Sequence, residues 1–396
     1  MTSSLMDWLS LLLRWAHVMA GIGWIGTSFY FIWLDESLRR RAGQDPRLAG
    51  ESWMVHGGGF YKVDKYLVAP ETLPDELHWF KYEAYLTWAT GMLLLAVIYY
   101  WGAESFLVGP TAVALTPAMA VTVSIASLAA GWFAYDLLCR SAIGANTALL
   151  AVTVFILITL AAFGYAQVFP GRAAFLHVGA FIGTIMAANV FAVIIPNQKK
   201  TVAALMAGKA PDAKYGVQAK QRSLHNNYLT LPVLFMMISN HYPLTYGHRW
   251  NWLVAVGVLV AGAMVRHFFN AQDAGKLTPS AKAALPGAAV LVVALALFTS
   301  WRPAPEAGEA VAFSDVHTIV RARCASCHAA RPTDQDFEEA PGGVMFDTPE
   351  ELRRYASRIE AQAVLTQTMP LGNKTGMTED ERRTLGAWIV QGAPLD

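Results

Sequence analysis

Near its C-terminal end the chain carries two cysteines and a histidine in the order Cys324-Ala-Ser-Cys327-His328. Thiols at this spacing lie about one helical turn apart, so both can add to the vinyl groups of one haem, and His328 then presents its imidazole to the iron. A zinc-binding or redox-active CxxC is the alternative. Because Cys139 is the only other cysteine, the motif does not arise from a cysteine-rich composition. The spacing therefore predicts covalently bound haem c.

A methionine downstream of the motif is the candidate for the sixth ligand of that iron. Thr368-Met369-Pro370 has the usual form of the distal ligand loop in a class I cytochrome c. Met345 and Met377 are alternatives, because spacing alone does not exclude them. Ligation by histidine and methionine raises the reduction potential, which suits an electron acceptor rather than an oxygen-activating haem.

The composition divides the chain into two parts. Of the 396 residues, 55% are hydrophobic and 15% charged, which is more apolar than an ordinary soluble domain. Long apolar runs fill residues 1–301 and are absent from 313–396. We predict an integral membrane catalytic domain over 1–301, a linker over 302–312 and a periplasmic cytochrome c domain over 313–396. The net charge of +1 argues against nucleic acid as a partner.

Eight apolar stretches in the first part are each close to the ~20 residues that cross a bilayer. They cover 9–34, 80–101, 117–138, 147–168, 173–195, 226–243, 251–270 and 284–301. The loops after the odd-numbered spans hold most lysines and arginines, whereas the loops after spans 2, 4 and 6 hold only Arg172 and Arg249. By the positive-inside rule the odd loops are cytoplasmic. This predicts a multi-pass protein of a bacterial inner membrane, in contact with lipid, with both termini periplasmic, where haem c is attached.

Spans 1 to 4 resemble spans 5 to 8. His17-Val-Met-Ala-Gly-Ile-Gly matches His177-Val-Gly-Ala-Phe-Ile-Gly in register, and shorter matches follow in the same order. We predict an all-α, eight-helix bundle built from a parallel four-plus-four repeat. His17 and His177 would then lie at equal depth across a pseudo-two-fold axis and could ligate a haem b iron. The alternative is that each is a buried polar residue bonded to a neighbouring helix.

A second polar set lies toward the cytoplasmic ends of spans 6 and 7. It comprises His225, Asn226 and Asn227 on span 6 with Arg266 and His267 on span 7. Polar side chains at membrane depth usually face a cavity or a partner. Three interpretations stay open: a second haem b held by His225 and His267, a pocket in which Arg266 offers a cationic fork to a planar anion, or a satisfied network at the helix ends.

With these features in place, the whole chain resembles the bacterial membrane-bound cytochrome c urate oxidases, or urate hydroxylases. The stretches that carry the resemblance are 17–34, 56–61, 78–83, the CxxCH segment and 369–373. The resemblance implies an enzyme that oxidises urate to 5-hydroxyisourate without making peroxide. Electrons would pass through haem to haem c, and then to a soluble cytochrome c or a terminal oxidase. We hypothesise that Arg266, Asn226 and Asn227 bind urate and that His225 or His267 takes its proton.

The location of urate decides how many haems the enzyme needs. From a cytoplasmic site, electrons must cross most of a ~30 Å hydrocarbon core, so a haem b at His17 and His177 would be needed as a relay. Without haem b, urate must bind near the outer face. Two rival functions remain: another membrane dehydrogenase, for example one that oxidises quinol, and an electron-transfer cytochrome subunit.

Overall fold

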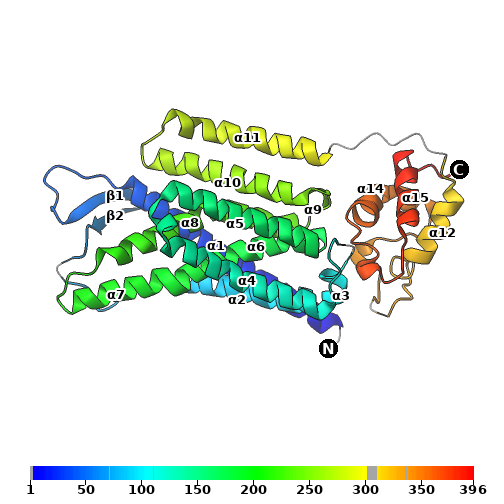
Figure 1. The fold of residues 1–396 in the computed structure, drawn as a ribbon, viewed down its shortest axis with the longest axis horizontal. Helices are drawn as coiled ribbons and strands as arrows, with labels where there is room; N and C mark the ends of the chain where they lie inside the picture. The colour runs from blue at the N-terminus through cyan, green and yellow to red at the C-terminus, as the bar shows by residue number, and fades with distance from the viewer. Residues whose placement is uncertain (1–2, 71, 110, 301–309, 336) are drawn as a thin grey trace.

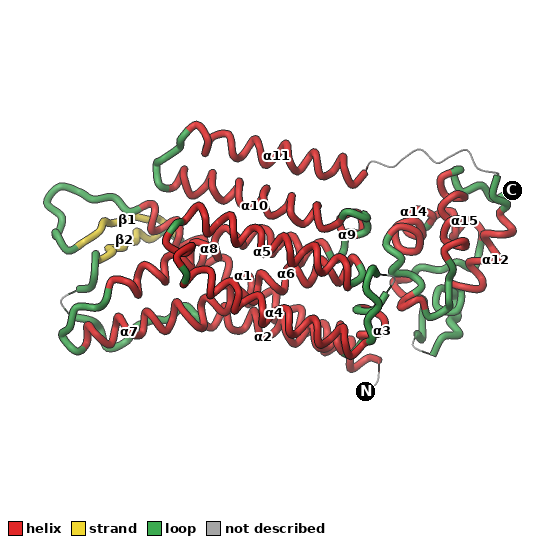
Figure 2. The backbone as a smooth tube through the Cα atoms, in the orientation of Figure 1, coloured by secondary structure: helices red, strands yellow, loops and turns green. Residues whose placement is uncertain are grey.

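The computed structural model describes residues 3–70, 72–109, 111–300, 310–335 and 337–396. Long helices run side by side in an elongated bundle, and a smaller group of helices lies at one end of it (Figures 1 and 2). The start of helix α1 (Ser3–Ser37) lies at that same end, and the hairpin β1–β2 lies at the opposite end (Figure 1). This arrangement agrees with an even number of passes along the bundle.

Each of the eight predicted spans falls on a helix. In chain order these are α1, α2 (Tyr82–Leu94) continued by η1 (Leu95–Tyr100), α4 (Pro117–Arg140), α5 (Thr147–Val168), α6 (Gly171–Ala188) continued by η3 (Asn189–Ile194) and α7 (Ile195–Met206), α8 (Ala213–Ser239), α10 (Asn251–Asp273) and α11 (Pro279–Ser300). Within the described residues, six helices are long and apolar enough to cross a membrane. The other two spans carry more polar and aromatic side chains: α2 begins with Tyr82 and Glu83, and α8 holds Asn226 and Asn227. The eight-span topology therefore stays a prediction.

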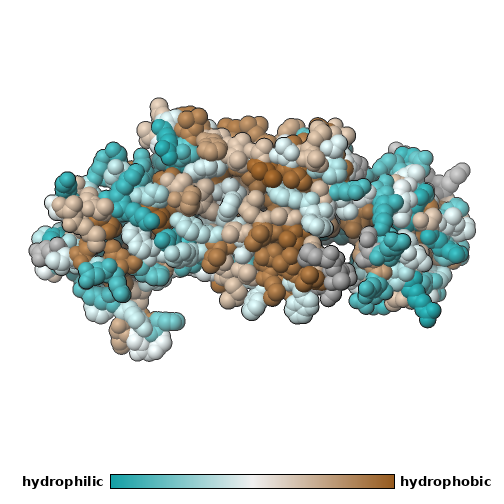
Figure 3. Space-filling model, turned by 90° about the horizontal axis from the view of Figure 1, so that it is seen from below, coloured by the Kyte–Doolittle hydropathy of each residue, from teal (hydrophilic) through white to brown (hydrophobic). Residues whose placement is uncertain are grey.

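The outer surface of the bundle is apolar around its middle. On the face drawn in Figure 3, hydrophobic residues gather over the centre of the bundle and hydrophilic residues cover both ends. Large outward-facing side chains include Trp15, Phe133, Leu160 and Leu297, each more than 60% exposed. An apolar outer surface of this kind is typical of a helical bundle that could lie in a membrane.

Helix α6 lies at the centre of the bundle and is its most buried helix. Phe175, Ile182 and Ile185 are almost fully buried in one core that extends to α4, α5, α8 and α10. A glycine permits the closest approach, since a Cβ on Gly131 of α4 would lie 2.1 Å from the Phe181 ring of α6. Helix α6 can pack this closely because a small residue, Gly131, faces a large apolar one, Phe181.

The segment after α1 forms a β-hairpin that the sequence analysis treated as loop. Strands β1 (Leu48–His56) and β2 (Gly59–Tyr66) pair antiparallel, and His56 opposes Gly59. The two residues between them, Gly57 and Gly58, have φ of 57° and 81°. A two-residue hairpin turn with positive φ at both positions favours glycine. The fold is mostly helical as predicted, with this hairpin added.

The C-terminal group of helices has a hydrophobic core of its own. Helices α12 (Phe313–Arg323) and α15 (Glu379–Val390) pack together through Val316, Val320 and Trp388. Between them lie the short elements η4 (Pro341–Gly343), α13 (Pro349–Arg354), α14 (Ala356–Ile359), η5 (Glu360–Leu365) and η6 (Leu371–Asn373). Residues 302–309 of the predicted linker lie outside the described residues.

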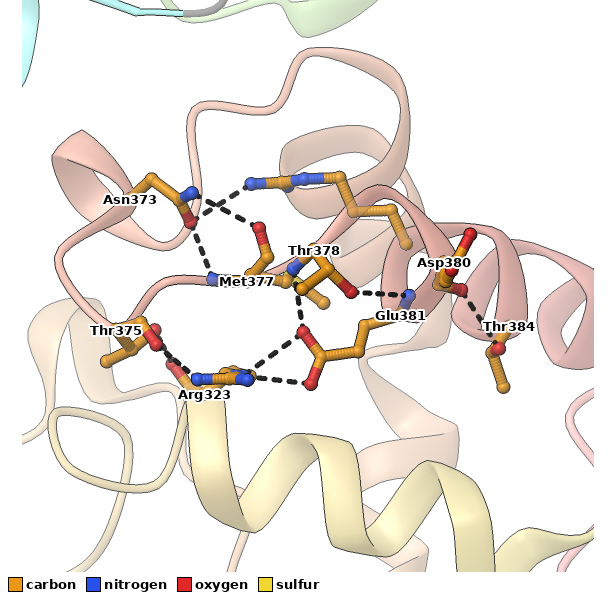
Figure 4. A network of polar contacts seen from close by, with 9 residues as sticks. Arg323, Asn373, Thr375, Met377, Thr378, Asp380, Glu381 and Thr384 are labelled. Carbon is orange, nitrogen blue, oxygen red and sulfur yellow. Dashed lines mark hydrogen bonds and ion pairs between the residues drawn. The ribbon is translucent and has the colours of Figure 1, made fainter.

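An ion pair joins the opening helix of this group to the closing one (Figure 4). Nε of Arg323, at the end of α12, donates to both carboxylate oxygens of Glu381 at 3.0 and 3.1 Å. Glu381 also accepts from the backbone amide of Thr378, whose hydroxyl caps α15 in return. Burial alone would raise the pKa of the Glu381 carboxyl, but the Thr378 amide and the Arg323 guanidinium outweigh it, so this pKa lies below its usual value.

Replacing Glu381 with Gln tests this link, because Gln keeps the capping box but loses the charge that pairs with Arg323. We expect amide exchange in α15 to accelerate about fivefold, or about 1 kcal/mol of opening free energy. Hydrogen-exchange mass spectrometry of the full chain measures this. In the wild type, the same loss of α15 stability should appear as the pH falls below about 4.3, the usual pKa of a glutamate carboxyl. The pKa of Glu381 is lowered because the fold stabilises its ionised form, so protonation removes that stabilisation.

Glu351→Gln is the matched control. Glu351 occupies the same position in the capping box of Thr348 at the start of α13, but the bonds described for it are only to backbone amides. Equal acceleration of exchange in the two variants would mean that the Arg323 pair contributes nothing.

Candidate functional site

A cavity of about 1420 Å³ lies between one end of the bundle and the C-terminal helices. Two short bundle elements reach across beside it: α3 (Ala103–Phe106) packs against η6, and α9 (Pro243–Tyr246) packs against η5. Its lining includes Cys324, Cys327, His328 and Met369 from the C-terminal side, and Phe106, Arg172, Asn240 and Tyr246 from the bundle. All four residues predicted to hold haem c therefore face one space.

The hydrogen bond made by His328 determines which of its ring nitrogens is available. Nδ1 lies 2.9 Å from the carbonyl oxygen of Val344. A carbonyl only accepts, so Nδ1 carries the hydrogen and the lone pair is on Nε2. A backbone acceptor that fixes the tautomer and orientation of a histidine is the usual support of a metal-ligating imidazole. His328 thus fits the role of an axial ligand.

The two cysteines follow the last turn of α12. The amides of Cys327 and His328 both donate to the carbonyl of Cys324, at 3.2 and 3.0 Å, which folds the motif into a tight turn. Burial raises the pKa of the Cys324 thiol to about 12 and also raises that of Cys327. A redox-active CxxC needs the opposite shift. The described part of the chain also contains no group of three His, Cys, Asp or Glu residues that could hold a metal ion.

Among the candidate sixth ligands the structure favours Met369. Met369 and Met377 both line the cavity, whereas Met345 is not among the described lining residues. Met377 is 3% exposed and belongs to the C-terminal core. Met369 is held by its backbone: its amide donates to Gln362 at 2.9 Å, and its carbonyl accepts from buried Arg382 at 2.8 Å. The residues present therefore fit a covalently attached haem with His328 and Met369 as its axial ligands.

Met369→Leu should keep the covalent haem but lose the sulfur–iron absorption band near the red end of the visible spectrum. It should also lower the reduction potential, because thioether ligation is what raises it. Optical spectroscopy and a potentiometric titration on the full chain measure both. Met345→Leu is the matched control and should change neither. Loss of the band in the control alone would reassign the ligand.

The structure does not bring His17 and His177 together. Nδ1 of His17 lies 2.9 Å from the Thr87 carbonyl of α2, the helix along which α1 packs. His177 is fully buried among Tyr99, Tyr165 and Phe169, with Nε2 2.7 Å from Ser124 Oγ and Nδ1 2.7 Å from the Ala173 carbonyl. Both ring nitrogens of His177 are thus engaged. A haem b here would require these bonds to break, and the pair stays a prediction.

Counting the haems tests that pair directly. Because His177 has no ring nitrogen to spare, we expect a pyridine haemochrome spectrum of purely c type, with one haem per chain. A b-type component that disappears in His177→Ala and persists in His248→Ala would restore the pair as a haem b site.

The second predicted set separates into two clusters on different sides of α8. In the first, His225 Nδ1 lies 2.7 Å from the Tyr135 hydroxyl, and Asn226 accepts from Asn189 at 2.9 Å. His267 is exposed and bonds to Tyr228 at 3.2 Å instead. His225 and His267 therefore bond to different neighbours, and a haem b held by both stays a prediction.

The second cluster surrounds Arg266. Its Nε donates to the Asn227 side-chain oxygen at 3.3 Å, a terminal nitrogen donates to Asn270 at 2.8 Å, and the guanidinium stacks on Phe29 at 4.2 Å from the ring centroid. Asn227 is fully buried, and its Nδ2 has no hydrogen-bond partner in the described structure. Arg266 and Asn227 are therefore together as predicted, whereas Asn226 belongs to the other cluster.

The sequence analysis missed a buried ion pair in the first cluster. Arg222 of α8, only 3% exposed, donates to Asp136 of α4 at 2.7 Å and to Asn189 at 3.3 Å. The available signal was Asp136, a carboxylate near the end of the otherwise apolar helix α4, where a charge usually pairs with another. The pair ties α4 to α8 and gives this cluster a structural role.

The bundle, and not the C-terminal group, matches a known protein family. Residues 3–300 match the family model described as urate oxidase N-terminal. The chain belongs to this family. No curated protein and no solved structure matches it. The match covers every helix from α1 to α11, relates the chain to urate oxidation, and stops before the segment that holds Cys324, Cys327 and His328.

Proposed function

We propose that this protein is a membrane-bound urate oxidase that hydroxylates urate to 5-hydroxyisourate and delivers the electrons to a covalent haem c. The observation that carries the proposal is the cavity in which the CxxCH segment and Met369 meet the end of a urate oxidase family bundle. A urate oxidase that uses oxygen directly has no need of such an acceptor. A c-type haem with His/Met ligation supplies a high-potential one-electron acceptor.

The residues around that acceptor have distinct tasks in this proposal. Cys324 and Cys327 attach the haem, and His328, oriented by Val344, ligates its iron. Arg382 bonds the carbonyls of Met369 and Ala363, which keeps the distal loop in place. The surface of the C-terminal group that faces away from the bundle would then pass electrons to a soluble cytochrome c or a terminal oxidase.

A membrane location is the second part of the proposal. Six apolar helices and the apolar belt of Figure 3 support embedding, and the distribution of lysine and arginine puts the hairpin end in the cytoplasm. The C-terminal group would then be periplasmic, in the compartment where haem c is attached. The periplasmic location also explains why an electron acceptor is fused at this end of the chain.

Anaerobic addition of urate to the purified full chain tests the function. We expect the α-band of haem c to appear, with two haem equivalents reduced per urate consumed and no peroxide formed in air. Xanthine, which is a planar purine of similar size, serves as the control. Reduction by quinol but not by urate would favour the rival membrane dehydrogenase, and reduction by neither would favour an electron-transfer subunit.

A further inference from the structure

The cavity between the bundle and the C-terminal helices is lined by more cations than anions. Arg172 and Arg249 come from the bundle, and Arg323, Arg358, Lys374 and Arg382 come from the C-terminal group. Three of these pair with carboxylates, Arg323 with Glu381, Lys374 with Asp334 and Arg382 with Glu379. Arg172, Arg249 and Arg358 have no carboxylate partner among the described residues. Such an excess of positive charge in a partly enclosed space attracts anions. At about 1420 Å³, the cavity also exceeds the roughly 300–1,000 Å³ of a typical single-ligand pocket. There is room for a second occupant beside a haem.

Arg172 is the cation best placed to bind that occupant from the bundle. Its Nε donates to the Asn240 side-chain oxygen at 2.7 Å, and the buried Tyr99 hydroxyl donates to the same oxygen at 3.3 Å. These bonds fix the guanidinium while leaving its terminal nitrogens without a bond to any described residue. No carboxylate of a described residue pairs with it. An arginine held in this way offers a planar two-donor fork to an anion.

The neighbours of Arg172 suit a flat, polar-edged ring. Phe106 and Tyr246 give the lining aromatic surface, which stacks on planar ligands. Tyr246 lies on α9, which packs against η5 of the C-terminal group. Asn240 and Asn251 add side-chain amides to the same wall, and amides read the donors and acceptors along a ring edge. Urate, a planar anion with such edges, matches this lining.

We propose that urate binds in this cavity, paired with Arg172 and adjacent to the haem c attachment residues, and not at Arg266. The inference rests on the proposed function and locates its substrate. Arg266 lies fifteen residues along α10 from Asn251, which lines the cavity, or about 22 Å at 1.5 Å per residue. Substrate in the cavity needs no relay through the membrane, in agreement with the engaged nitrogens of His177.

The proposed oxidation of urate balances in atoms and electrons. Urate and one water give 5-hydroxyisourate with loss of two electrons and two protons, and the new C–O bond takes its oxygen from water. A haem c held by Cys324, Cys327 and His328 would supply the one-electron oxidant, used twice per urate, and the external acceptor would take up the two electrons. The protons leave to the solvent that reaches the cavity.

Binding measured without turnover tests the site. Equilibrium dialysis of radiolabelled urate against the dithionite-reduced holoprotein gives a dissociation constant, since reduced haem cannot accept electrons. We expect Arg172→Gln to weaken binding at least roughly tenfold and Arg172→Lys to weaken it less. Arg321→Gln, on the exposed side of α12, is the matched control and should bind as the wild type does.

Arg266→Gln provides the opposing outcome. If that variant loses urate binding while Arg172→Gln keeps it, the cavity is not the substrate site. Correct folding of each variant is checked by its haem c content and α-band. Failure of the wild type itself to bind urate would refute the proposed function, whereas wild-type binding with unchanged Arg172→Gln would refute only this location.

Sidedness gives a second, independent measurement. Urate is a charged solute, so it reaches only the face to which it is added on a short time scale. In spheroplasts, external urate should reduce haem c within the mixing time, and in inverted membrane vesicles it should do so only after permeabilisation. Immediate reduction in the inverted vesicles would overturn the proposal.

Discussion

The apolar belt around the bundle is the constraint on which the rest of the structure depends. Water must be excluded from it, so the polar groups needed for chemistry can lie only at the two ends or in the interior of the bundle. Most interior polar groups are then satisfied locally, although Asn227 Nδ2 and Thr159 Oγ1 are exceptions among the described residues. His177 bonds Ser124 and Ala173, and Arg222 pairs with Asp136. Full satisfaction stabilises the bundle, but it also removes those side chains from ligand binding.

The two ends of the bundle are therefore where ligands can enter, and they differ. The cytoplasmic end in the proposed topology carries the hairpin, whose charges pair among themselves through Glu51 with Arg41 and Lys62. The other end carries Arg172, which like Arg266 pairs with no described carboxylate but which, unlike Arg266, lines the cavity beside the C-terminal group. Charge left unpaired beside a cavity is the feature expected of a site for an anion, because an empty site of this kind gains most from binding one.

How much could be predicted from the sequence follows from the range of the interactions involved. Helices such as α4 and α5 form at the predicted residues, because a run of apolar side chains determines them. The CxxCH motif is equally local, and the structure places it with Met369 as expected. The hairpin was missed although the Gly57-Gly58 turn is visible in the sequence, because the flanking strands are only partly apolar.

Long-range pairings could not be obtained in this way. Nothing in the spacing of Asp136 and Arg222 indicates that they meet, and the hydrogen bonds of His17 to Thr87 and of His177 to Ser124 and Ala173 could not be read from the repeat. In the sequence, Arg172 stands out only as one of the two cations in the predicted outer loops. The positive-inside rule does not explain an arginine in an outer loop. The cavity does, because Arg172 lines it. If substrate and acceptor share one end of the bundle, the membrane helices need carry no electrons. Their task is then to hold Arg172, Asn240 and Tyr246 rigidly against the C-terminal group, which their dense packing around α6 is suited to do.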